Sequence, residues 1–98
     1  MVVVLRAVKN KVKSNYELKG DISFNIRRYR KAKHLTQEEL AESADISYDF
    51  MRRIETSKGT CGFSIYTIYK ISLALGVSIS DLIVTNEEVK EKVSESDL

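Results

Sequence analysis

The sequence contains no proline, no tryptophan, one cysteine and one histidine among its 98 residues. Proline breaks helices and punctuates all-β folds, so its absence leaves the chain free to form uninterrupted helices. The single cysteine, Cys61, cannot make an intrachain disulfide, which favours the reducing cytoplasm. No apolar run has the roughly 20 residues of a membrane span, and the opening segment 1–5 is too short for a signal peptide. The length fits one compact domain.

The residues that most enzymes need are scarce as well. The chain has no glycine-rich phosphate loop, and one cysteine with one histidine cannot form a metal-binding set. The histidine, His34, follows a helical pattern at the point where a left-handed residue is expected, so we assign it to the end of that helix. We therefore expect neither an enzyme nor a cofactor.

The net charge of +2 conceals an asymmetry along the chain. Residues 1–35 hold ten basic and two acidic side chains, a difference of +8, whereas residues 36–98 hold six and twelve, a difference of −6. Such a split is typical of a protein with one side facing a polyanion, although a solvated basic helix gives the same numbers. Charge alone does not decide between the two.

Residues 1–20 form a predicted N-terminal arm that stands apart from the rest. The density of β-branched residues in 2–8 favours a β-strand, and the segment 9–11 could turn it into a second strand through Leu18. The alternative is a helix with apolar residues three, four and four apart, namely Leu5, Val8, Val12 and Tyr16. The arm is basic enough to follow phosphates, and its exposed valine edge is a candidate for dimerisation.

Residues 21–85 have the pattern of five short helices, which predicts an all-α domain. The first is expected from about residue 22 to residue 33, with Asp21 as its N-cap. Four more are expected to begin at the capping residues Thr36, Ser47, Ser64 and Ser78. Gly76 is placed to end the fourth helix, and the fifth is expected to bury Leu82 and Ile83. An acidic tail, 86–98, follows.

The second and third helices form the informative unit. They are joined by a tight turn at Asp45, and the small side chains of Ala41 and Ala44 allow the helices to approach closely. The third helix needs only Met51 and Ile54 to dock, which leaves its opposite side projecting from the domain. A helix about 10–12 Å across fits the major groove of DNA, about 12 Å wide. Aromatic and guanidinium groups on that outer side would then face bases and phosphates.

Several spaced segments resemble the helix-turn-helix family of phage Cro and repressor proteins. They are Leu35-Thr-Gln-Glu-Glu-Leu-Ala41, Ile46-Ser47, Ile54-Glu55, Ile71-Ser-Leu-Ala-Leu-Gly-Val77 and Asp81-Leu82. The resemblance covers about residues 22–84, and it is specific because the segments agree in order. It implies a five-helix repressor-type domain whose third helix, about 47–56, reads the major groove.

The same resemblance implies roles for individual residues. Against bases it places Tyr48, Asp49, Arg52 and Arg53. Against phosphates it places Gln37, Ser47, Thr56 and Lys58. It also pairs Arg30 with Glu55, an ion pair that would fix the orientation of the third helix more than it adds stability.

Three positions depart from the family pattern. Asp45 and Ser57 stand where glycine is usual, and Phe50 replaces a small polar residue. We expect Phe50 to pack against the domain, with contact to a thymine methyl as the alternative. Asp49 would repel phosphate, so it should either accept a hydrogen bond from cytosine or orient a neighbouring arginine.

The expected function is that of a sequence-specific regulator that binds double-stranded DNA in the cytoplasm. One domain of this size contacts few base pairs, so we expect a homodimer on an inverted repeat. The segment 59–66, the fifth helix and the termini are all candidates for the interface. The alternative is a protein-binding module on the same fold, such as an antitoxin that masks a partner toxin, with DNA binding secondary.

Overall fold

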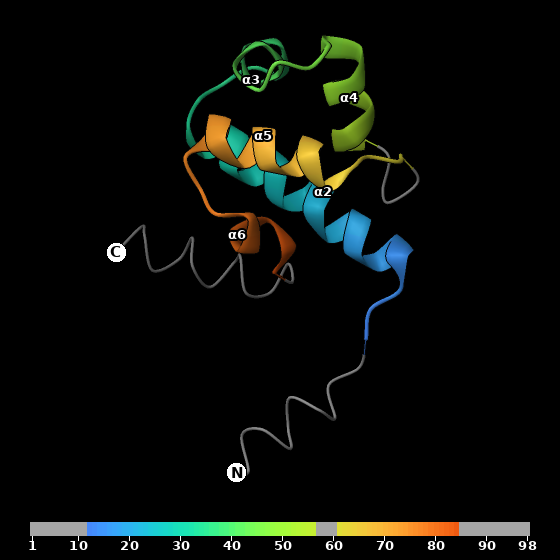
Figure 1. The fold of residues 1–98 in the computed structure, drawn as a ribbon. Helices are drawn as coiled ribbons and strands as arrows, with labels where there is room; N and C mark the ends of the chain where they lie inside the picture. Colours follow the sequence, from blue (N-terminus) through green and yellow to red (C-terminus); the bar gives the residue numbers. More distant parts are fainter. Residues whose placement is uncertain (1–11, 57–60, 85–98) are drawn as a thin grey trace, which may run out of the picture.

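The computed structural model describes residues 12–56 and 61–84, and every regular element in these two ranges is an α-helix (Figure 1). In chain order the helices are α2 (Asn15–Ala32), α3 (Gln37–Ser43), α4 (Tyr48–Thr56), α5 (Ile65–Leu75) and α6 (Ile79–Ile83). The prediction of an all-α, five-helix domain is confirmed for this part of the chain. None of these helices is both long and apolar enough to cross a membrane.

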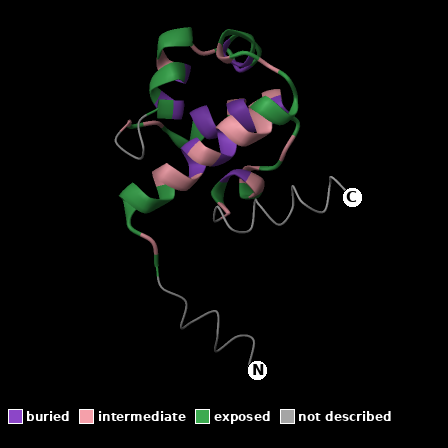
Figure 2. Cartoon of the chain, turned by 180° about the vertical axis from the view of Figure 1, so that it is seen from behind, coloured by how far each residue is buried: buried purple, intermediate pink, exposed green. Residues whose placement is uncertain are grey.

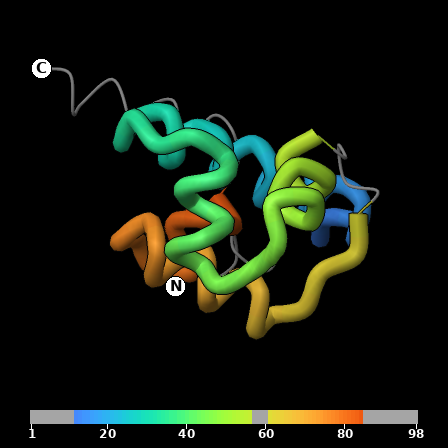
Figure 3. The backbone as a smooth tube through the Cα atoms, turned by 90° about the horizontal axis from the view of Figure 1, so that it is seen from above, coloured from blue at the N-terminus to red at the C-terminus, as the bar shows by residue number. Residues whose placement is uncertain are grey.

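The five helices are arranged around α2, the longest of them. Helix α5 crosses in front of α2 in Figure 1, and α2 comes to the front when the molecule is seen from behind in Figure 2. Helices α3 and α4 lie together at one end of the domain, and α6 lies at the other. Seen from above in Figure 3, α3, α4 and the turn between them are nearest the viewer. The helix-turn-helix unit therefore forms one end of the molecule.

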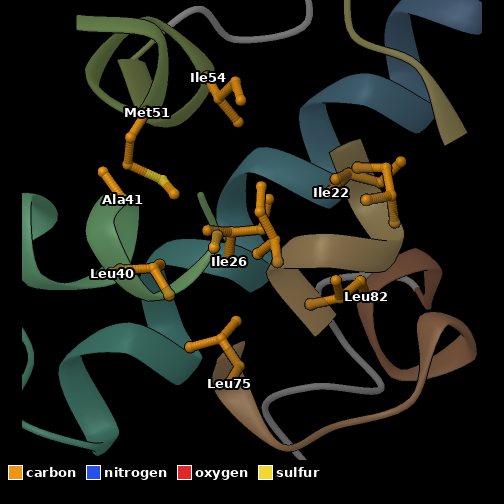
Figure 4. Close-up of a cluster of buried hydrophobic side chains, with 11 residues drawn as sticks. Ile22, Ile26, Leu40, Ala41, Met51, Ile54, Leu75 and Leu82 are labelled. Carbon is orange, nitrogen blue, oxygen red and sulfur yellow. The ribbon is translucent and has the colours of Figure 1, made fainter. Parts of the chain in front are cut away.

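Side chains from every helix meet in one apolar core. Figure 4 shows Met51 and Ile54 of α4 directed toward the same cluster as Leu40 of α3 and Ile26 of α2. Seven core side chains have no exposed surface, namely Ile26, Leu40, Met51, Ile54, Ile71, Leu75 and Leu82. The residues expected to dock α3 and α4, including Ala41 and Ala44, are all buried. Burial of a Leu, Ile or Met side chain contributes about 1.5–3 kcal/mol, so this shared core holds α4 in place.

The helix ends follow the local signals in the sequence. Thr36 accepts a hydrogen bond from the amide of Glu39 at 3.0 Å, and Glu39 accepts one from the amide of Thr36 at 2.8 Å. His34, Asp45 and Gly76 adopt left-handed backbone conformations, with φ of 58°, 56° and 70°. The predicted capping box of α3, the serine caps of α4 and α5, and the turns at His34, Asp45 and Gly76 are confirmed.

The start of α2 differs from the prediction. The helix begins at Asn15 and is capped by Ser14, whose side chain accepts from the amide of Glu17 at 3.1 Å while Glu17 accepts from the amide of Ser14. Asp21 as N-cap is therefore wrong, because a complete capping box seven residues earlier sets the start. The Asp21 carboxylate forms an ion pair with Lys13 instead.

This early start also decides part of the arm. Residues 15–18 are helical, so a second β-strand through Leu18 is wrong, and Val12 precedes the cap, so it does not share a helix with Tyr16. The remaining prediction, a strand or helix over residues 1–11, lies outside the described residues. So do Ser57, Lys58 and the acidic tail.

Helix α6 is linked to α2 by hydrogen bonds from one buried side-chain amide, that of Asn25. The Nδ2 atom of Asn25, a residue with no exposed surface, donates to the carbonyl oxygens of Leu82 at 2.7 Å and Val84 at 2.9 Å. Leu82 is buried as expected, but Ile83 is 43% exposed, so its predicted burial is wrong. Consecutive side chains of a helix point about 100° apart, so Ile83 points away from the side on which Leu82 is buried.

Candidate nucleic-acid interface

Helix α4 is anchored to the domain along one side only. Met51 and Ile54 have no exposed surface, and Glu55 keeps 2%. Ser47 starts the helix by accepting a hydrogen bond from the amide of Phe50 at 3.1 Å. Ser47 fixes the beginning of the helix, and the buried residues fix its inner side. None of these contacts covers the outer side of the helix.

The outer side of α4 is open and carries charge. The side chains of Asp49 and Arg53 are each 62% exposed and that of Arg52 is 56% exposed, while Tyr48 keeps 46%. In Figure 1 this helix stands at the end of the domain, away from α6. All four residues expected to face bases are therefore accessible from outside and lie on one short helix.

Asp49 organises the two arginines of this surface. Its Oδ1 accepts from Nη2 of Arg52 at 2.8 Å, and its Oδ2 pairs with Nε of Arg53 at 3.2 Å. The hydrogen bond from Arg52, with the positive charge of Arg53, holds the pKa of the Asp49 carboxyl below its usual range. The carboxylate is consequently charged at neutral pH, as the arrangement with two arginines requires.

Phe50 packs beneath this group. It is partly buried against the core cluster, which confirms the expected packing role. The guanidinium carbon of Arg53 lies 5.7 Å from the centre of the Phe50 ring, within the range of a cation–π contact. Arg53 is thus held from two sides, by Asp49 and by Phe50.

A second set of contacts, centred on Glu55, ties α4 to α2 and α3. Nε of Arg30 donates to Oε2 of Glu55 at 2.7 Å, and Nη2 donates to Oε1 at 2.9 Å. Gln37, the first residue of α3, donates from Nε2 to the same Oε1 at 3.1 Å. One buried carboxylate thereby joins three helices and sets the angle at which α4 leaves the domain.

Residues 25–88 match the Cro/C1-type HTH DNA-binding domain, and this stretch is well over half of the chain. The chain belongs to the Cro/C1-type helix-turn-helix family. Its members are DNA-binding domains and not enzymes, and α4 is the second helix of the helix-turn-helix unit. No group of three or more His, Cys, Asp or Glu residues that could hold a metal ion occurs in residues 12–56 and 61–84.

Two solved structures have the same fold. One is described as the hypothetical transcription factor NHTF from Neisseria; it is 24% identical, with 84% of this chain and 92% of that chain covered and a TM-score of 0.69. The other is the clp gene regulator ClgR from C. glutamicum; it is 28% identical, with 66% and 82% covered and a TM-score of 0.60. No curated protein matches the sequence.

The residues assigned to phosphates by the Cro/C1-type pattern differ in whether a hydrogen is available to donate to a phosphate. The Oγ of Ser47 accepts the cap bond, so its hydroxyl hydrogen is left to donate. One amide hydrogen of Gln37 is used by Glu55 and the other remains. The hydroxyl of Thr56 donates to the carbonyl of Arg52 at 2.8 Å and must rotate before it can donate to a phosphate. Lys58 lies outside the described residues.

Two features of this surface were not foreseen from the sequence. Nη1 of Arg27 donates to the carbonyl of Glu55 at 3.1 Å, so it covers an exposed end of α4. A shallow hollow of about 330 Å³ lies between Tyr48, Arg30 and the first residues of α3. Neither has a local signal in the sequence, because each depends on how α2, α3 and α4 pack together.

Proposed function

We propose that this protein is a transcription regulator that binds a specific double-stranded DNA site as a homodimer, with α4 of each copy in the major groove. The observation that carries the proposal is the exposed outer side of α4, with Tyr48, Asp49, Arg52 and Arg53 on it while Met51 and Ile54 anchor it. Membership of a family of DNA-binding domains and the likeness to proteins described as transcription regulators support it.

Among the base-facing residues, Arg53 is the strongest candidate for a contact with guanine. Asp49 engages it through Nε, which leaves both terminal nitrogens to donate to the O6 and N7 atoms of a guanine. Arg52 engages Asp49 through the terminal nitrogen Nη2, so one of its two terminal nitrogens is shared with the carboxylate. In this proposal Asp49 orients the arginines, and Gln37, Ser47, Thr56 and Lys58 contact phosphates.

The first experiment is selection of bound sequences from random duplex DNA at a stated salt concentration. A homodimer with two copies of α4 about 34 Å apart should recover an inverted repeat with half-sites one helical turn apart. Recovery of a single isolated half-site would contradict the homodimer, and recovery of no preferred sequence would contradict specific recognition.

The second experiment tests Arg53 on the recovered site. Arg53→Ala should weaken binding by about 1–3 kcal/mol, and the loss should be confined to one base pair of each half-site in a titration followed by fluorescence anisotropy. The matched control is Lys33→Ala, which removes one positive charge near Gly76, away from α4. An equal loss on every sequence would make Arg53 a phosphate contact.

A further inference from the structure

The exposed side of α5 carries a row of large apolar side chains. Ile65 is 72% exposed, Tyr66 63%, Tyr69 46% and Leu73 63%; we call these four residues the α5 stripe. At 3.6 residues per turn they fall within a sector about 100° wide. The two tyrosine rings stack, with centres 6.3 Å apart. Single exposed apolar residues are common on soluble proteins, but a contiguous row of four usually marks a contact surface.

The stripe borders the helix-turn-helix unit. Next to it, Nζ of Lys70 donates to the carbonyl oxygen of Asp45 at 3.0 Å, in the turn between α3 and α4. The same Nζ lies 4.9 Å from the centre of the Tyr66 ring. A molecule bound to the stripe would therefore lie beside the turn that precedes α4. A twofold pair formed through the stripe would bring the two helix-turn-helix units close to the axis, as two half-sites one helical turn apart require.

We propose that the α5 stripe is the surface through which two copies of this chain pair, α5 against α5 around a twofold axis. The inference rests on the proposed function, since it names the partner that the DNA site requires. In a twofold interface each residue meets the same patch on the partner, so like charges would face each other. The stripe contains no charged residue, and the neighbouring Lys70 is already bound by the Asp45 carbonyl and the Tyr66 ring.

The chemistry of the stripe fits a copy of itself in two further ways. A tyrosine hydroxyl both donates and accepts, so Tyr66 and Tyr69 can bond to their own counterparts across the axis. The exposed parts of the four side chains offer on the order of 400 Å² per molecule, since a tyrosine buries 150–250 Å² when fully covered. A standard interface buries about 800 Å² per partner, so the stripe is large enough to be its apolar centre.

The positions within the stripe predict the register of the pair. Tyr69 lies midway, four residues from Ile65 and four from Leu73. With the axis at Tyr69, two antiparallel helices bring Tyr69 next to its own counterpart. Leu73 of each copy then faces Ile65 of the partner subunit.

Charged substitutions at the midpoint test this arrangement. Tyr69→Glu and Tyr69→Lys should each raise the dimer dissociation constant of the full chain at least 100-fold in sedimentation equilibrium, because like charges would meet across the axis. An equimolar mixture of the two variants should restore a dimer, because the opposite charges would then meet. The control is Tyr16→Glu, at an exposed tyrosine on α2, which should leave the dissociation constant unchanged.

A second pair of variants covers the case in which substitution of Tyr69 prevents folding. Leu73→Glu mixed with Ile65→Lys should form a heterodimer more stable than either variant alone, since these positions face each other in the predicted register. Both residues are more than 60% exposed and tolerate a charge in the monomer.

Several outcomes would overturn the inference. The first is a wild-type chain that stays monomeric with and without DNA. The second is a dimer dissociation constant that neither set of variants changes, and the third is a mixture of oppositely charged variants that fails to restore the dimer. Loss of the dimer in Tyr16→Glu alone would place the interface on α2 and its arm. Binding of a different protein through the stripe by an otherwise monomeric chain would identify a heterologous partner.

The proposed function and this interface can fail separately. Binding to a duplex with one half-site does not need a dimer, so Tyr69→Lys should retain it even when binding to the full site is lost. A chain that dimerises through the stripe but prefers no DNA sequence would refute the proposed function alone. A dimer that binds its site specifically and is insensitive to the Tyr69 and Leu73 variants would refute the interface alone.

Discussion

Removal of Arg30 should destabilise the domain strongly, because it leaves a buried charge without its partner. The Glu55 side chain has no exposed surface and that of Arg30 keeps 11%. Arg30→Ala removes two of the three side-chain donors to this carboxylate and the bond from Nη1 to the carbonyl of Leu35 at 2.8 Å. Among the described residues, the side-chain amide of Gln37 would then be the remaining donor to the carboxylate.

The expected cost is about 3–5 kcal/mol, the usual effect of breaking a buried ion pair by deleting one member. Small domains have a total free energy of unfolding of only about 5–15 kcal/mol, so the variant should lose a large part of it. The measurement is urea unfolding followed by circular dichroism, with the slope of free energy against urea compared between proteins. An unchanged slope would show that the loss is one of stability and not of compactness.

A double variant separates the charge from the packing. Arg30→Met combined with Glu55→Met removes both charges and keeps apolar volume, so its stability should return to within about 1 kcal/mol of wild type or exceed it. The exposed arginine of the same surface is the control, and Arg52→Ala should leave the urea midpoint unchanged. A cost below about 1 kcal/mol for Arg30→Ala would mean that the pair behaves like a solvent-exposed one, and the reasoning from burial would be refuted.

Three further predictions concern stability and are checked by the same urea titration. Alanine should have opposite effects at two glycines. Gly76→Ala, at φ 70°, should cost about 1–2 kcal/mol, whereas Gly20→Ala, inside α2 with open space around it, should stabilise the domain by about 0.5–1 kcal/mol. Equal effects of the two substitutions would contradict the argument from backbone conformation. Asn25→Ala should cost about 1–3 kcal/mol and speed hydrogen exchange in α6, since two carbonyls lose their donor. Ile54→Ala should cost about 2–5 kcal/mol and loosen α4, and a change below 1 kcal/mol would place Ile54 outside the core.

The parts of the fold that the sequence predicts well depend on residues close together in the chain. A capping box joins residues three apart, such as Thr36 and Glu39. A residue in the left-handed conformation, such as His34, ends the helix that precedes it in the chain. The start of α2 was misplaced although Ser14 and Glu17 carry the same signal. Gly20 and Asp21 resemble a helix boundary, and the valine-rich segment before them favoured a strand.

The features that were missed depend on packing between distant segments. Asn25 and Leu82 are 57 residues apart, and nothing local to either predicts their hydrogen bond. The α5 stripe was missed for a different reason. The spacing of Ile68, Ile71 and Leu75 predicts the buried side of α5 correctly. The other side also carries large apolar residues, and the sequence does not tell that Tyr66, Tyr69 and Leu73 stay exposed instead of packing against another segment.

The positions at which the described chain begins and ends decide on which side of the domain a fused protein would lie. In Figure 1 the described chain begins below α2, on the side of the domain away from α3 and α4. It ends at Val84, just after α6, where the Val84 carbonyl accepts a hydrogen bond from Asn25, and this end lies on the same side (Figure 1). A tag or fused protein attached at residue 12 or at residue 84 would therefore start on the side of the domain away from α4. Both positions suit a reporter that must not compete with a duplex bound at α4.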